Sequence, residues 1–173
     1  MVLSPILSIT SLIALVCIRA ARYTVPVNYI LLSLFTIGET IVVAQFTSQL
    51  EVFSVLLSIA ALAFVIGILF VTALYTKISA NLFRNLVVGV LIAAVSQLVL
   101  FFIMLFSGFS HAMLLLYAGI GVLITGFYIL IDLVQIMTPD VVSYDDYILG
   151  AMLLYIDIIR MFIYILAILG KSK

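Results

Sequence analysis

Residues 52–75 read VFSVLLSIAALAFVIGILFVTALY, a stretch that contains no charged side chain. About 20 mostly apolar residues in a helix are enough to cross the hydrocarbon core of a bilayer. Inside that core a helix satisfies all of its backbone polar groups without water. The stretch therefore predicts a transmembrane helix and indicates an integral membrane protein.

The composition of the whole chain agrees with this interpretation. Of the 173 residues, 68% are hydrophobic and 8% are charged, whereas a soluble domain is about half apolar and about a quarter charged. Five further apolar stretches follow or precede the first, separated by short polar connectors. The predicted spans are 3–18, 25–46, 52–75, 86–106, 112–131 and 147–169. We expect one domain over residues 1–173, an all-α polytopic helical bundle, with 3–18 as its shortest span.

The composition also excludes several classes of function. Seven basic and seven acidic side chains cancel, so the chain has no excess of positive charge for binding nucleic acid. One cysteine and one histidine, Cys17 and His111, do not form a pattern of metal ligands. The sequence has no glycine-rich loop for phosphate. We therefore expect that the protein is not an enzyme and has no cofactor. We expect membrane lipid to surround it.

The basic residues of the connectors predict the orientation. With six spans, Arg19, Arg22, Lys77 and Arg84 lie on one side of the membrane. Because lysine and arginine are enriched in cytosolic loops, this side is predicted to be cytosolic. Both ends of the chain then lie on the lumenal or outer side.

Four ionisable residues lie within or at the edge of the spans: Glu39, Asp132, Asp157 and Arg160. Inserting such a residue costs about 2.5 to 3.5 kcal/mol, so each one marks a candidate functional site. Asp132 and Asp157 are equally far along the chain from the middle of the connector between the last two spans. Because those spans run antiparallel, the two carboxyl groups are predicted to lie at similar depth.

The helical period predicts which way these acids face. At about 100° per residue, Asp132 shares a face with Gly121 and Thr125, while Asp157 shares a face with Arg160. If the two faces meet, the carboxyl groups come together in a medium of low dielectric. Both cannot then ionise easily, and the pair can hold one shared proton. Such a pair predicts a pH sensor or a cation site, and its oxygen ligands suit Ca²⁺.

A plainer interpretation is equally compatible with the pattern. Asp132 then simply ends its helix in contact with water, and Asp157 forms an ion pair with Arg160 three residues later. Glu39 is also compatible with two interpretations. It lies in the polar stretch 36–40 and either lines a wet cavity or forms a hydrogen bond to a neighbouring helix.

The last third of the chain carries a more specific pattern. Residues 128–136 read YILIDLVQI, and residues 143–166 read SYDDYILGAMLLYIDIIRMFIYIL. The D-x-x-Q end of one span, the S-x-x-D-Y entry to the next and the L-Y-x-D-I-I core together resemble the transmembrane Bax inhibitor motif family, especially its lifeguard branch. Residues 34–39, LFTIGE, are similar to the glutamate-bearing third span of lifeguard proteins.

The resemblance implies a fold in which six helices surround a central last helix. It also implies a pH-sensitive Ca²⁺ leak channel of endoplasmic reticulum or Golgi membranes that suppresses cell death. Asp132 and Asp157 match the paired aspartates of the family, which share a proton in the closed state. Arg19 or Arg22 matches the basic residue that latches this pair, and Glu39 matches the acidic residue of the third span.

Two features depart from the family pattern. The family has seven spans and we count six, with no counterpart to the first. Arg160 stands three residues after the last aspartate, where the family usually has asparagine, and a cation at this position repels Ca²⁺.

The leading hypothesis is therefore a Ca²⁺ leak channel, or a regulator of organelle Ca²⁺, that inhibits apoptosis. The first alternative is a non-conducting interaction protein that modulates cell death by binding other membrane proteins. The second is a proton-coupled transporter or complex subunit, in which Glu39 and Asp157 relay protons.

Overall fold

The computed structural model describes residues 3–18, 23–75, 80–108, 110–137 and 147–171. The described α-helices are α1 (Leu3–Cys17), α3 (Val27–Thr47), α4 (Val52–Tyr75), α5 (Ala80–Ser107), α6 (His111–Met137) and α7 (Tyr147–Leu169). Five of the described helices are long and apolar enough to cross a membrane, and α1 is shorter. The predicted fold class, a helical membrane bundle, is confirmed.

Two helices extend beyond the predicted spans. The fourth predicted span starts at residue 86, but α5 begins at Ala80; the fifth ends at residue 131, but α6 continues to Met137. Both extensions contain polar residues, which lower the hydropathy of a segment but do not prevent it from forming helical hydrogen bonds. Asp132 therefore lies inside α6. The interpretation in which it ends its helix is wrong.

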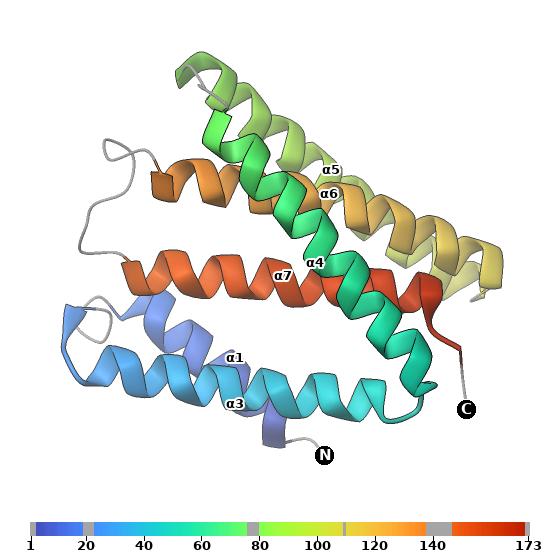
Figure 1. Ribbon diagram of the computed structural model, residues 1–173, viewed down its shortest axis with the longest axis horizontal. Coiled ribbons are helices and arrows are strands. Elements are labelled where there is room, and N and C mark those ends of the chain that lie inside the picture. Colours follow the sequence, from blue (N-terminus) through green and yellow to red (C-terminus); the bar gives the residue numbers. More distant parts are fainter. Residues whose placement is uncertain (1–2, 19–22, 76–79, 109, 138–146, 172–173) are drawn as a thin grey trace.

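The last helix, α7, lies in the middle of the bundle. It contacts α3, α4 and α6, while α1 packs on α3 and α5 packs on α6. Figure 1 shows α7 between α3 and α6, with α4 crossing over it. This arrangement matches the central last helix that the family resemblance implies.

The ends of the helices alternate between two sides of the bundle. Figure 1 shows the C-terminal ends of α1, α4 and α6 on the same side as the N-terminal ends of α3, α5 and α7. The predicted orientation requires this alternation, because the basic connectors follow α1 and α4. Which side is cytosolic stays a prediction.

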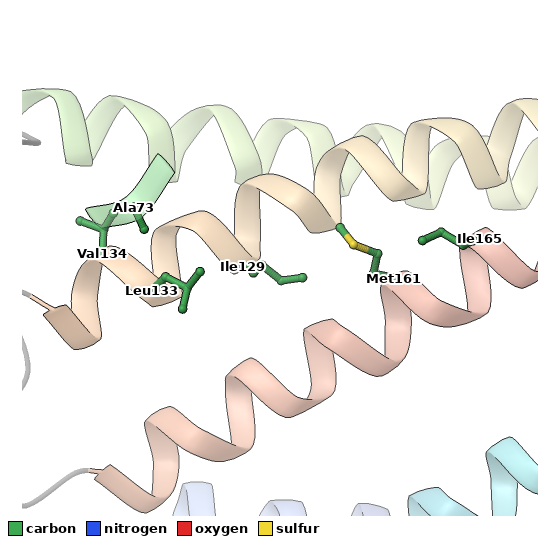
Figure 2. Packing of buried hydrophobic residues seen from close by; sticks show 6 residues of the cluster. All are labelled: Ala73, Ile129, Leu133, Val134, Met161 and Ile165. Carbon is green, nitrogen blue, oxygen red and sulfur yellow. The ribbon is translucent and has the colours of Figure 1, made fainter. Parts of the chain in front are cut away.

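Two buried clusters hold α7 in place. The first joins α4, α6 and α7 and consists of Ala73, Ile129, Leu133, Val134, Met161 and Ile165 (Figure 2). The second joins α1, α3 and α7 and consists of Leu15, Phe35, Ile148 and Met152. Large apolar side chains cover the outside of the bundle; Phe64, for example, is 70% exposed. Such a surface suits lipid and not water.

A close approach between α6 and α7 depends on Gly121. A Cβ atom at this position would lie 2.7 Å from the ring of Tyr164. That distance is far below van der Waals contact, so the ring or the helix has to move to admit a side chain. Gly121, on the face of α6 that carries Asp132, thus allows α7 to pack closely.

We expect Gly121→Ala to lower the free energy of unfolding in detergent by about 1 to 3 kcal/mol, the usual cost of overpacking a core. Gly119→Ala is the matched control, because no atom lies within 4 Å of a Cβ built at Gly119. Thermal unfolding of both variants measures the difference. Equal stability of the two variants would show that Tyr164 yields without cost.

Candidate functional site

The antiparallel helices α6 and α7 bring Asp132 and Asp157 to one pocket. This pocket has a volume of about 600 Å³ and also receives residues of α1. We call it the aspartate pocket, and its lining residues are Leu12, Ile13, Val16, Cys17, Tyr128, Asp132, Leu153, Ile156, Asp157 and Arg160. The two faces that the helical period predicts do meet.

The carboxyl groups of Asp132 and Asp157 line this same pocket. Asp132 Oδ2 is buried and has no hydrogen-bond partner among the described residues. A buried acceptor without a donor costs about 1 to 3 kcal/mol. A hydrogen bond between two carboxyl groups requires one proton, so a proton held by the pair removes this cost.

Arg160 forms an ion pair with Asp157. Its Nη1 donates a hydrogen bond of 3.3 Å to Asp157 Oδ1. The side chain of Asp157 is 11% exposed and that of Arg160 is 48% exposed. The ion pair of the plainer interpretation is thus present, and it coexists with the pair of carboxyl groups. Because half of the Arg160 side chain is exposed, the pair is of the weaker, partly screened kind.

Glu39 lines a different pocket, of about 280 Å³, which also receives Arg160 and Tyr164. We call it the Glu39 pocket. Thr36 and Thr40, which flank Glu39 in the sequence, donate hydrogen bonds to backbone carbonyls of α3 itself, at 2.9 and 2.7 Å. Glu39 therefore lines a cavity, which is one of the two interpretations that the sequence leaves open. Among the pockets found in the described part of the chain, the Glu39 pocket receives neither aspartate.

The two candidate latch residues, Arg19 and Arg22, lie outside the described residues. Cys17, the last residue of α1, lines the aspartate pocket. Arg19 follows it by two positions in the sequence. The latch stays a prediction.

Gln97 of α5 is a polar residue that the sequence analysis did not single out. It is 8% exposed, and its Nε2 donates a hydrogen bond of 3.1 Å to the carbonyl oxygen of Tyr117. Its Oε1 is buried without a partner among the described residues. A neutral amide within an apolar run is the feature of the sequence that indicates this position.

Gln97 lines a third pocket, of about 320 Å³, between α5, α6 and α7. We call it the glutamine pocket. The side chains with polar groups around it are Gln97, Tyr117, Thr125, Tyr128, Arg160 and Tyr164.

The aspartate pocket supplies two carboxyl groups, which is fewer oxygen ligands than a firmly bound metal ion needs. The described residues contain no group of three or more histidine, cysteine, aspartate or glutamate side chains that could hold a metal ion. Ca²⁺ normally takes six to eight oxygen ligands, and two carboxyl groups supply too few for firm binding.

Comparison with known proteins gives the family of the chain. The family model described as "Inhibitor of apoptosis-promoting Bax1" matches residues 1–173. The chain is 31% identical to mouse "Protein lifeguard 4" (Mus musculus) over 153 residues, which cover 86% of this chain and 60% of that protein. It is 25% identical to human "Protein lifeguard 3" (Homo sapiens) over 172 residues, covering 95% and 54%.

A plant protein is similar as well. The chain is 29% identical to a "BI1-like protein" of Arabidopsis thaliana over 147 residues, covering 85% of this chain and 57% of that protein. The chain thus matches between half and two thirds of the length of these relatives. Because the family model covers the whole chain and the described helices form an apolar bundle, this integral, multi-pass membrane protein belongs to the Bax inhibitor family.

Proposed function

We propose that this protein is a pH-sensitive Ca²⁺ leak channel of an organelle membrane and that it regulates cell death through this leak. The observation that carries the proposal is the pair of carboxyl groups in one pocket, with Asp132 Oδ2 buried and unpartnered among the described residues. The description of the matching family, inhibitors of apoptosis-promoting Bax1, supports the cell-death part.

The chemistry of the pair explains how a proton controls the leak. With one shared proton, the two carboxyl groups attract each other and hold α6 against α7. When that proton leaves, two negative charges face each other in a medium of low dielectric, where they repel each other and attract a divalent cation. The titratable residues that line the pocket besides the aspartates are Cys17, Tyr128 and Arg160. Arg160 is the cation among them.

The leak requires no chemical reaction, so the proposed protein is not an enzyme. We place it in the endoplasmic reticulum or the Golgi because of its resemblance to lifeguard proteins. Its proposed cargo is Ca²⁺, and its partners are membrane lipid and other membrane proteins of cell-death pathways.

Ca²⁺ efflux from liposomes that contain the purified protein tests this proposal. We expect Asp132→Asn to lower the efflux about tenfold, because it removes one of the two carboxylates that attract the ion; tenfold corresponds to about 1.4 kcal/mol. Glu51→Gln is the matched control, since Glu51 does not line the aspartate pocket. Equal efflux from wild type and Asp132→Asn would contradict the proposal.

A second candidate function is that of a non-conducting interaction protein. The ion pair between Arg160 and Asp157 favours it, because a guanidinium group already occupies one carboxylate of the pocket. This candidate predicts no Ca²⁺ efflux from wild type or Asp132→Asn, and equal protection of cells against apoptosis by both. A proton relay between Glu39 and Asp157 has less support, because the two line separate pockets and Arg160 lines both.

A further inference from the structure

Three pockets of the bundle meet at one side chain. Arg160 lines the aspartate pocket, the Glu39 pocket and the glutamine pocket. Tyr128 also lines both the aspartate and the glutamine pocket. The aspartate and glutamine pockets are therefore neighbours, with Arg160 at their junction.

Together these two pockets follow one face of α6. Asp132, Tyr128, Thr125, Gly121 and Tyr117 line one or both of them and recur every three or four residues. At about 1.5 Å per residue, the distance from Asp132 to Tyr117 along the helix is about 22 Å. The hydrocarbon core of a bilayer is about 30 Å thick. The two pockets thus extend along most of the depth of a membrane.

The glutamine pocket contains an acceptor that needs a partner. Gln97 Oε1 is buried and has no hydrogen-bond partner in the described part of the chain, and the residue as a whole is more than nine-tenths buried. Leaving such an acceptor unpaired is costly unless water or an ion binds to it. One water molecule occupies about 30 Å³ in the liquid, so a pocket of about 320 Å³ has room for several. The pocket therefore has room for water molecules around this acceptor.

Arg160 is positioned to separate the two pockets. It carries the positive charge at their junction, and a hydrogen bond of 3.3 Å to Asp157 Oδ1 holds its guanidinium group. A fixed cation at this junction opposes the entry of a second cation. Because the side chain is half exposed, it has room to move aside.

We propose that the glutamine pocket continues the Ca²⁺ route beyond the aspartate pocket, with Gln97 Oε1 as a binding position for the hydrated ion and Arg160 as the barrier between the pockets. This inference rests on the proposed leak function and names the second half of its path. It requires water to reach Gln97 from the aspartate pocket, and to reach it more readily when Arg160 is removed.

Cysteine labelling tests the route without measuring Ca²⁺. In the full chain carrying Cys17→Ser, single cysteines are introduced by Gln97→Cys and Ala94→Cys, which both line the glutamine pocket. Val95→Cys is the matched control, because Val95 is 61% exposed on the outside of the same helix and does not line that pocket. The probe is a cationic, membrane-impermeant methanethiosulfonate reagent. It reacts with the thiolate, and a thiolate forms in water but not in lipid.

We expect Gln97→Cys and Ala94→Cys to react at least about tenfold faster than Val95→Cys. Water in the pocket solvates the thiolate, and about 1.4 kcal/mol of extra solvation corresponds to a tenfold ratio of rates. Ala94→Cys keeps the test valid if loss of the amide disturbs folding. Reaction of both pocket cysteines at the slow rate of Val95→Cys would overturn the route.

The barrier has its own readout. With reagent applied from the side of the aspartate pocket, adding Arg160→Asn should speed the labelling of Ala94→Cys several-fold. An unchanged rate would overturn the role of Arg160. If the pocket cysteines are labelled but the protein shows no Ca²⁺ efflux, the leak function is contradicted and the water-filled route is not. If the protein shows efflux but the pocket cysteines are not labelled, the route alone is contradicted.

Discussion

Replacing Arg160 by asparagine is expected to raise Ca²⁺ efflux about tenfold. The guanidinium group lines the aspartate pocket and donates a hydrogen bond to Asp157 Oδ1. Without it, both carboxylates are available to a divalent cation and the positive charge that repels the ion is gone. Point charges a few ångströms apart at an effective dielectric constant of about 20 interact by several kcal/mol. Because Arg160 is half exposed and screened, we expect the smaller effect of about 1.4 kcal/mol, which is tenfold.

The measurement is efflux from liposomes at equal protein content, with Lys171→Asn as the control. Lys171 is an exposed cation outside the three pockets, so its loss should leave the efflux unchanged. Arg160→Asn also introduces the asparagine that the family resemblance leads us to expect at this position. Unchanged or reduced efflux in Arg160→Asn would mean that the guanidinium group does not oppose the ion.

Replacing Phe35 by alanine is expected to lower the free energy of unfolding by about 3 kcal/mol, the lower end of the usual cost of Phe→Ala in a packed core. Phe35 is 1% exposed and joins α3 to α1 and α7 in the second buried cluster. Its ring makes an edge-to-face contact with Tyr155 of α7, with the ring centroids 5.8 Å apart. The cavity left behind removes these packing contacts.

Phe46→Ala is the matched control, because Phe46 lies on the same helix and is 60% exposed to the surroundings. Unfolding of both variants in detergent gives the comparison. Since α1 forms one wall of the aspartate pocket, a loosened second cluster should also make the leak less dependent on pH. Equal stability of Phe35→Ala and Phe46→Ala would contradict the role of this cluster.

Much of the fold is predictable from the sequence because lipid imposes one strong rule, an apolar helix of sufficient length. Each of the six predicted stretches contains a helix, and 52–75 and 147–169 have the predicted bounds. The rule failed at the polar ends of α5 and α6. Hydropathy measures transfer into lipid, whereas the helix ends where its backbone hydrogen bonds end, so Asp132 was placed at the edge of a span and lies inside α6.

The meeting of Asp132 and Asp157 was also predictable, because an antiparallel pair with a central connector fixes depth and the helical period fixes direction. The glutamine pocket was not. Gln97 comes from α5 and the other polar groups come from α6 and α7, so only the packing of three helices reveals the pocket. For the same reason, the sequence placed Arg160 beside Asp157 but gave no sign that it lines three pockets.

Ca²⁺ efflux from liposomes over a series from about pH 5 to pH 8, for wild type and Asp157→Asn, tests the shared proton most directly. In wild type the pair loses its proton as the pH rises, so efflux should increase with pH. In Asp157→Asn the two-carboxyl site is absent, so efflux should stay low and nearly independent of pH. The same efflux at every pH in wild type, unchanged in Asp157→Asn, would contradict a gate built on Asp132 and Asp157.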